Sequence, residues 1–211
     1  MPHRRPAGCT RRALLLLAHL LLLWSSPRPA FSAQGEAEAL LRWNDSLPPP
    51  PRSADALASW SLNGSAAVAA APAPCAWRGV SCESLGRVVG VDVAGAGLAG
   101  TLAALDLQSL PSLGSLNLSF NALTGGFFPP NVSAPLLSVR SIDLSNNNLS
   151  GPVPATLPAY VPSLEHLNLS SNQFTGEIPD TLDKLTKLQS LVLHSNNLSV
   201  AYRRCLATSP G

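Results

Sequence analysis

The amino-acid sequence predicts an α/β solenoid, a right-handed superhelix of stacked repeats whose short strands form one parallel, concave sheet. Four triplets of the L-x-L type carry this prediction, because they recur 26, 25 and 24 residues apart. They are Leu116/Leu118, Ile142/Leu144, Leu167/Leu169 and Leu191/Leu193, and the asparagines Asn121, Asn147, Asn172 and Asn196 each lie five positions after the first aliphatic residue. This pattern with a period near 25 is the signature of leucine-rich repeats.

Each triplet is predicted to be a strand of the concave sheet. Side chains alternate between the two faces of a strand, so the flanking leucines point into a core and the residue between them points out. The asparagines are predicted to turn inward and bond backbone groups of adjacent turns, as an asparagine ladder. A degenerate first repeat aligns Val91-Asp92-Val93 as its strand, with Ala96 at the ladder position, so five repeats are expected.

Residues 1–32 are predicted to be a secretory signal peptide. Arg4, Arg5, Arg11 and Arg12 precede a 12-residue apolar stretch, Ala13 to Trp24, and a small-residue cleavage site follows at Ala30-Phe31-Ser32. A membrane span needs about 20 apolar residues, so this stretch is too short for one, and the sequence offers no second candidate. The segment holds five of the 14 Lys and Arg residues and none of the 12 acidic ones, which leaves a net charge of −3. A secreted, extracellular protein without affinity for nucleic acid is therefore expected.

The remaining chain divides into a cap at residues 33–86, five repeats at 87–199 and a non-repeat tail at 200–211. An amphipathic helix is predicted over Glu36 to Asn44 and a short helical turn over Asp55 to Trp60. These elements are expected to cover the open apolar edge of the first repeat. The Ala- and Pro-rich stretch at 65–74 is predicted to be a mobile surface loop. The repeat pattern breaks after Ser199, which is expected to leave the apolar flank of the last repeat uncovered.

Three cysteines follow the signal segment. Cys75 and Cys82 are close enough in sequence to form a disulfide in an oxidising compartment. The alternatives are two free thiols or half of a metal site, although no other Cys or well-placed His completes a zinc set. Cys205 is left as an odd cysteine.

Seven N-x-S sequons are candidate N-glycosylation sites in a secreted chain. They lie at Asn44, Asn63, Asn117, Asn131, Asn148, Asn168 and Asn197. Each tripeptide is weak evidence for glycosylation, because N-L-S also occurs in leucine-rich repeats for structural reasons.

The sequence offers no catalytic or cofactor chemistry. The two histidines beyond the signal segment, His166 and His194, are predicted to lie too far apart for a shared metal or a catalytic pair. Asp92 and Asp143 are separated by two repeats, which makes a paired-carboxylate site improbable. We find no phosphate-binding loop, nucleophile elbow or kinase motif, so an enzyme is not expected.

A binding surface is the remaining functional feature. The outward positions of the predicted strands give a lining of small and polar residues without Trp, Tyr or Arg, the residues that favour binding hot spots. These positions are Gly90, Asp92, Ala94, Ser115, Asn117, Ser119, Ser141, Asp143, Ser145, His166, Asn168, Ser170, Ser190, Val192 and His194. Asp92, Ser115, Ser141, Asp143, His166, Ser190, Val192 and His194 are the candidate binding residues. An equal alternative is a scaffold face whose affinity lies in other repeats.

Two further motifs resemble those of plant leucine-rich-repeat receptors. Repeats three and four continue as Leu149-Ser150-Gly151-Pro152-Val153-Pro154 and Phe174-Thr175-Gly176-Glu177-Ile178-Pro179, similar to the L-x-G-x-I-P run of the plant class. The segment from Cys75 to Cys82 resembles the C-x-W-x-G-V-x-C motif of the plant cap, which favours the disulfide over the alternatives. The plant class implies a second short strand in each repeat. Repeat two departs from the motif, with Gly125-Gly126-Phe127-Phe128-Pro129-Pro130, so its second strand is in doubt.

The resemblance covers nearly all of residues 36–199 and implies the start of a receptor-like kinase or receptor-like protein ectodomain. Such ectodomains bind a peptide, a steroid or a co-receptor, and full-length members are single-pass membrane proteins. The leading hypothesis is therefore an interaction module at the cell surface, truncated before its membrane helix and kinase. The alternatives are a secreted inhibitor of pathogen wall hydrolases, similar to polygalacturonase-inhibiting proteins, and a secreted decoy of a full-length receptor.

Overall fold

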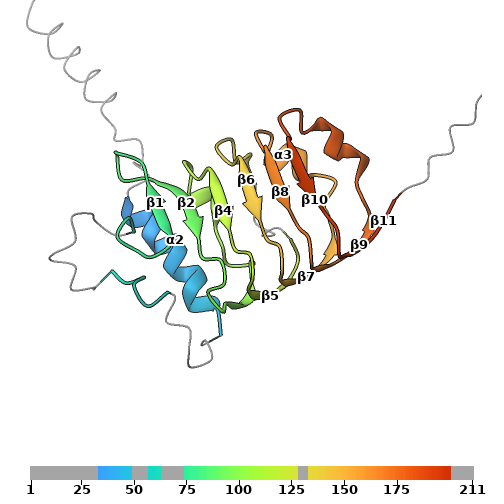
Figure 1. The fold of residues 1–211 in the computed structure, drawn as a ribbon. Helices are drawn as coiled ribbons and strands as arrows, with labels where there is room; N and C mark the ends of the chain where they lie inside the picture. The colour runs from blue at the N-terminus through green and yellow to red at the C-terminus, as the bar shows by residue number, and fades with distance from the viewer. Residues whose placement is uncertain (1–32, 49–56, 63–73, 128–132, 201–211) are drawn as a thin grey trace, which may run out of the picture. The chain divides into compact units, whose positions relative to one another are not determined.

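The structure is a computed structural model that describes residues 33–48, 57–62, 74–127 and 133–200 (Figure 1). All of them belong to one unit of the chain, Phe31–Gly211. The predicted signal peptide, most of the predicted 65–74 loop, Cys205 and nearly all of the predicted tail lie outside the described residues. Within the described part, no helix is both long enough and apolar enough to cross a membrane.

Six strands form the concave sheet, in the order β1-β2-β4-β6-β8-β10 (Figure 1). They are β1 (Val80–Cys82), β2 (Val88–Asp92), β4 (Ser115–Asn117), β6 (Ser141–Asp143), β8 (His166–Asn168) and β10 (Ser190–Val192). Strands β2 to β10 pair in parallel, and β1, which belongs to the cap, is antiparallel to β2. The predicted parallel sheet of a leucine-rich-repeat solenoid is confirmed.

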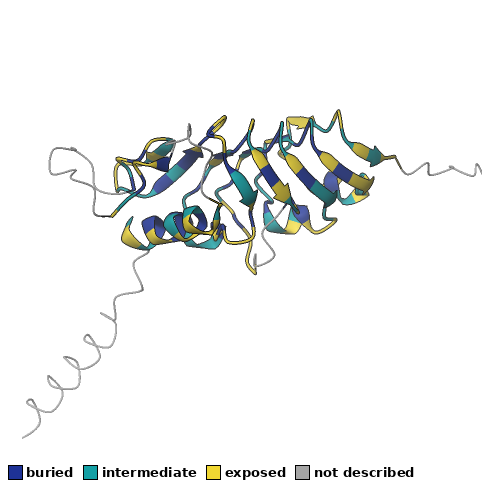
Figure 2. Cartoon of the chain, turned by 90° about the horizontal axis from the view of Figure 1, so that it is seen from below, coloured by how far each residue is buried: buried dark blue, intermediate teal, exposed yellow. Residues whose placement is uncertain are grey.

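The register is the same at every parallel pair of the concave sheet. Gly90 pairs with Ser115, Ser115 with Ser141, Ser141 with His166, and His166 with Ser190. Equivalent residues of successive repeats therefore form rows across the sheet. The middle residue of each triplet strand from β4 to β8 is buried, and Figure 2 shows dark blue bands crossing the strands where the core lies.

A second sheet of five strands has the order β11-β9-β7-β5-β3. Its strands are β3 (Ala99–Thr101), β5 (Ala122–Gly125), β7 (Asn148–Pro152), β9 (Gln173–Glu177) and β11 (Asn197–Ser199). All four pairs are parallel. Each repeat thus contributes one strand to each sheet, as the resemblance to the plant class implies.

The doubt about a second strand in repeat two was wrong. Strand β5 pairs with β3 on one side and with β7 on the other. The physical reason is that repeat two departs from the plant motif only after Gly125. This glycine has a φ of 83°, close to the values of 84° at Gly151 and 80° at Gly176. The strand is complete before the irregular residues begin.

Short helical segments return the chain from the second sheet to the next concave strand. They are η2 (Leu107–Ser109), α3 (Leu157–Tyr160) and η3 (Asp180–Lys184), and each buries one leucine, at Leu107, Leu157 and Leu182. Phe127 and Phe174 meet edge to face in the interior, with ring centroids 6.0 Å apart. The core therefore runs continuously from repeat to repeat.

Burial decreases at the fifth repeat. Leu167 of repeat four is 1% exposed, whereas the equivalent Leu191 is 40% exposed and Val200 is 71% exposed. Leu193 and Leu198 are only partly buried against the core. The described part of repeat five thus presents an apolar flank, in the place where the sequence predicts one.

The N-terminal cap begins with α2 (Ala33–Ser46), two to three residues longer at each end than the predicted helix. Its buried face consists of Glu36, Ala37, Ala39, Leu40 and Trp43. Of the predicted second helical turn, residues 57–60 are described, and the Trp60 N–H donates to the Leu57 carbonyl at 2.8 Å. A disulfide joins Cys75 and Cys82, with an S–S distance of 2.03 Å.

Three tryptophans form the centre of the cap. Trp60 stacks on Trp77 with ring centroids 5.5 Å apart, and its other neighbour, Trp43, lies 6.4 Å away at a tilt. Each indole N–H donates to a backbone carbonyl, at Thr101, Arg78 and Ser61 for Trp43, Trp60 and Trp77 respectively. The Trp43 bond connects helix α2 with strand β3, so the cap is fixed to the first repeat.

Candidate binding face

The concave sheet presents the predicted candidate residues on one surface. The first residues of the strands form a row in which Ser115, His166 and Ser190 are exposed and Ser141 is half-buried. The third residues form a parallel row, from exposed Asp92 through half-buried Asp143 to Val192. His194 lies just beyond β10 and is exposed. The register thus brings all eight candidates onto a single face.

A row of side-chain caps stabilises the ends of the concave strands. The Oδ1 atoms of Asn117, Asp143 and Asn168 each accept the N–H and the hydroxyl of the serine two residues later, at 2.7 to 3.2 Å. Asp92 accepts the Ala94 N–H in the same way, at 3.2 Å. Such local bonds fix the turn that follows each strand. Val192 has no such acceptor, so repeat five lacks this cap.

Asp143 is held more firmly than Asp92. Its second carboxylate oxygen accepts a hydrogen bond from the Asn168 amide at 3.1 Å, in the next repeat. The Asp92 side chain is exposed and bonds only to the N–H of its own turn among the described residues. Asp92 is therefore the candidate with most of its carboxylate available to a ligand, whereas Asp143 orders the surface.

The two histidines do not form a common site. His166 pairs with Ser190 across the sheet, and His194 lies four residues beyond that serine. The nearest polar partner of His194 is Ser195, whose Oγ is 3.2 Å from Nδ1. The described residues contain no group of three His, Cys, Asp or Glu side chains that could hold a metal ion.

Each of the four ladder asparagines lies between the concave strand and the second-sheet strand of its repeat, and it connects neighbouring repeats. Asn172 is typical, because its Oδ1 accepts the N–H of Leu149 at 3.0 Å and its Nδ2 is 2.9 Å from the Leu144 carbonyl, both in the previous repeat. Asn121, Asn147 and Asn196 make the equivalent contacts. These residues satisfy backbone groups and are not available to a ligand.

The sequons are distributed over different surfaces. Asn148 and Asn197 are exposed on the second sheet, whereas Asn117 and Asn168 are half-buried on the concave face. At Asn117 and Asn168 the sequon serine is the partner of the asparagine in the strand-end cap. Asp143 makes the same bonds to Ser145 without a sequon, so structure alone accounts for those two N-L-S tripeptides. Asn44 is half-buried in α2, and Asn63 and Asn131 lie outside the described residues.

Comparison with known proteins relates this geometry to a family. A family model described as leucine rich repeat matches residues 138–198, and one described as leucine rich repeat N-terminal domain matches residues 33–83. The leucine-rich repeat receptor-like serine/threonine-protein kinase RGI4 of Arabidopsis thaliana is 33% identical over 154 residues. A chain of the BIR3–SERK2 complex of Arabidopsis thaliana is 33% identical, with a TM-score of 0.62 over 76% of this chain and 81% of that one. The chain belongs to the plant leucine-rich-repeat receptor ectodomains.

The match of this receptor ectodomain to longer relatives is confined to part of their length. It covers 73% of this chain but 13% of RGI4. The ectodomain of the Arabidopsis thaliana receptor kinase HAESA, solved in complex with an extended IDA peptide hormone, is 30% identical with a TM-score of 0.60. That match covers 80% of this chain and 30% of the HAESA chain. The similarity lies in the repeats and the cap.

Two surface features of the receptor ectodomain were missed by the sequence analysis. An ion pair joins Arg140 to Glu165 at 2.6 Å, at the positions just before β6 and β8. Phe120, in the turn after β4, is 65% exposed. The equivalent turn positions in the neighbouring repeats are Gly95 and Asn146, so alignment of the turns would have identified an unusual aromatic residue there.

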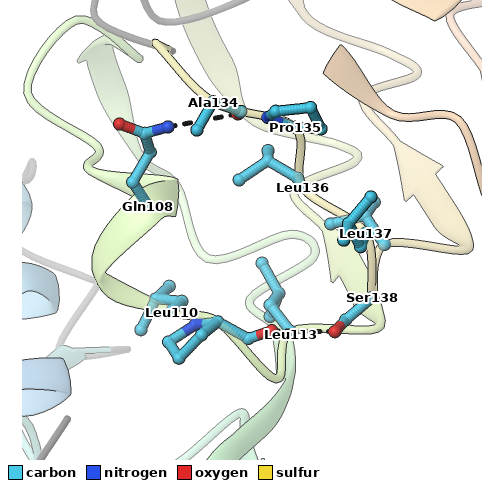
Figure 3. A pocket seen from close by; sticks show the side chains of 10 residues that line it. Gln108, Leu110, Leu113, Ala134, Pro135, Leu136, Leu137 and Ser138 are labelled. Atoms are coloured by element: carbon cyan, nitrogen blue, oxygen red, sulfur yellow. Dashed lines mark hydrogen bonds between the residues drawn. The ribbon is translucent and has the colours of Figure 1, made fainter. Parts of the chain in front are cut away.

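The receptor ectodomain also has a cavity of about 380 Å³ away from the concave face. Leu110, Leu113 and Leu136 line it, between η2 and the chain that leads to β6 (Figure 3). Hydrogen bonds from Gln108 to the Ala134 carbonyl and from Ser138 to the Pro111 carbonyl connect its two walls. None of its lining residues is titratable, so it is an apolar packing feature without catalytic groups.

Proposed function

We propose that this chain is an extracellular protein-interaction module whose concave face binds the ectodomain of another leucine-rich-repeat receptor. The observation that supports this most is the similarity in extent to a chain of the BIR3–SERK2 complex, of which this chain covers 81%. That structure is a complex of BIR3 with SERK2. The two rows of small and polar residues on the concave face offer the surface for such a contact.

A peptide ligand is the alternative within the same class of function. The HAESA complex with the IDA peptide supports it, although this chain covers only 30% of that ectodomain. The small polar lining favours a broad contact with a protein surface over a deep pocket for a single side chain, because it holds no aromatic or arginine anchor. We therefore rank the ectodomain of a second receptor above a peptide as the partner of the concave face.

A binding experiment on the secreted, purified chain tests the proposal. The probe is the SERK2 ectodomain of Arabidopsis thaliana, and affinity is measured by calorimetry with and without IDA peptide. Ser141→Trp places a large side chain in the centre of the concave row and is expected to weaken binding at least tenfold. Gln173→Trp, on an exposed position of the second sheet, is the matched control and should leave the affinity unchanged. Equal affinity of both variants would move the contact away from the concave face.

We also propose that the module acts in the apoplast, or at the plasma membrane within a longer receptor that carries a membrane helix and a kinase. The open flank at Leu191 and the 13% coverage of RGI4 support a longer product. Sequencing of the transcript across the Ser199 codon tests it, because a reading frame that continues into further repeats is expected. A stop codon soon after Gly211 in every transcript would instead favour a short secreted form, such as a decoy.

A further inference from the structure

Phe120 occupies a turn position that is left-handed in every repeat. The φ angles at Gly95, Phe120, Asn146, Ser171 and Ser195 are 60°, 55°, 55°, 55° and 56°. Glycine adopts this conformation without cost, and asparagine adopts it more readily than other residues. A bulky aromatic residue is disfavoured there. Repeat two thus carries the residue least suited to the backbone of this turn.

The phenyl ring of Phe120 provides no packing that would offset this cost. Its side chain is 65% exposed and is not part of the hydrophobic core or of the apolar residues packed against it. The backbone N–H donates to the Ser145 carbonyl at 3.0 Å, a bond that any residue other than proline can make. The residue is therefore unfavourable both in conformation and in exposed apolar area, which is typical of a functional position.

The surroundings of Phe120 leave the ring accessible from the side of repeat one. The Gly95 N–H donates to the Ser119 carbonyl at 2.9 Å, so Gly95 lies next to the turn that carries Phe120. A Cβ atom added at Gly95 would meet no atom within 4 Å, and Ala94 is small and exposed. Gly95 and Ala94, the Gly95–Ala94 shelf, therefore add no bulky side chain to the surface next to this turn.

An exposed carboxylate lies in the same region. Asp92 pairs with Asn117 in the sheet, and Phe120 follows Asn117 by three residues. Asp92 and Asn117 are the last residues of β2 and β4, so Asp92 and Phe120 lie at the same end of neighbouring strands. No lysine or arginine lies among the outward positions of the concave sheet that the structure describes, so the charge of Asp92 is available to a cation from outside.

We propose that Phe120, the Gly95–Ala94 shelf and Asp92 form an anchor site for a partner protein that presents an apolar side chain beside a lysine or arginine. The inference rests on the proposed function and specifies where the partner is held. The ring contributes buried apolar area and an aromatic face at low side-chain entropy cost, since it has only two rotatable bonds. Asp92 supplies the charge complementarity that orients the partner and speeds association.

The test uses the full secreted chain and the SERK2 ectodomain as probe. Phe120→Asn installs the residue that repeat three has at this position. It is expected to raise the unfolding midpoint, because strain is relieved, and to weaken SERK2 binding at least tenfold. Leu137→Asn removes another strongly exposed apolar side chain, outside the concave sheet, and should leave the affinity unchanged. Asp92→Asn should weaken binding at low salt and have a smaller effect at high salt.

The outcomes separate the anchor site from the proposed function. A lower unfolding midpoint for Phe120→Asn would show that the ring is structural and would overturn the inference. Unchanged affinity of Phe120→Asn for SERK2, with native binding intact, would overturn the anchor site and leave the proposed function standing. Failure of the native chain to bind SERK2 at any accessible concentration would remove the proposed function and the anchor site together.

Discussion

The Glu36 carboxylate accepts a hydrogen bond from the backbone N–H of Val88, 52 residues later in the chain, at 2.8 Å. Glu36 lies on the buried face of α2, and Val88 is the first residue of β2. The bond satisfies a buried backbone group at the junction between the cap and the first repeat. The other oxygen, Oε1, is buried without a hydrogen-bond partner among the described residues, so a charged carboxylate at this position is poorly solvated.

We expect the stability of the cap to depend on pH through Glu36. Burial raises the pKa of this carboxyl above its usual value, and the Val88 N–H and the Arg87 charge oppose that rise. A group whose pKa is higher in the folded chain stabilises the fold fully below its unfolded pKa, and this contribution is lost as the pH rises through the folded value. The unfolding free energy of Glu36→Gln, relative to that of the native chain, should therefore increase as the pH is raised above the usual pKa of a glutamate side chain.

Chemical denaturation of both chains at a series of pH values measures this difference. Glu38→Gln, which changes an exposed carboxylate of the same helix, reports the effect of losing a charge without burial. An unfolding free energy of Glu36→Gln that falls relative to that of the native chain with rising pH would contradict the assignment, because it would mean that the ionised carboxylate is favoured in the fold.

Glu36 also shows which part of the fold could not be predicted from the sequence. The amphipathic pattern predicted helix α2, but a glutamate on the buried face has no periodic signal, and its partner is a backbone group 52 positions away. The tryptophan stack is similar, because Trp43, Trp60 and Trp77 come from three different segments of the cap, outside the repeat pattern. The repeats were predictable because the same residue types pack at the same positions of every repeat.

The asparagine ladder is expected to contribute strongly to stability where it is buried. Asn172 is 9% exposed, and truncation to alanine leaves the Leu149 N–H and the Leu144 carbonyl without their partner. Unsatisfied buried groups each cost about 1–3 kcal/mol, so Asn172→Ala should lower the unfolding free energy by about 3 kcal/mol. Asn197→Ala, at an exposed asparagine of β11, should change it by less than about 0.5 kcal/mol. Equal losses in urea denaturation would refute a structural role specific to the ladder.

The disulfide is expected to stabilise the cap by restricting the unfolded chain. Cys75 and Cys82 are separated by 7 residues, and closure of so short a loop corresponds to about 2.5 kcal/mol in the chain-entropy description. The double variant Cys75→Ser/Cys82→Ser should lose about this amount in guanidinium denaturation. Reductant should destabilise the native chain to the same extent and have no further effect on the double variant. A further effect would point to a different disulfide.

The candidate site was predictable only in part, for a physical reason. Period-two alternation identifies which residues point out of the concave sheet, and the register places Ser115, Ser141 and His166 in one row as the repeat spacing implies. A search for the repeat pattern, however, does not identify residues that depart from the repeat. Phe120 is one of these, since it stands where the neighbouring repeats have Gly95 and Asn146.

The apolar flank of repeat five gives the last prediction, from a matched pair of leucines. Leu167 and Leu191 occupy the same position in successive strands and pair with each other in the sheet, but they are 1% and 40% exposed. Truncation of a buried leucine costs about 2–5 kcal/mol, because lost burial and a cavity both contribute. Leu167→Ala should therefore lower the unfolding free energy by about 3 kcal/mol. Leu191→Ala should cost about 1 kcal/mol or less, since its exposed side leaves no enclosed cavity.

Urea denaturation of the two variants compares them directly. Equal losses would show that Leu191 is covered in solution, for example by a second copy of the chain, and sedimentation of the native chain would test this.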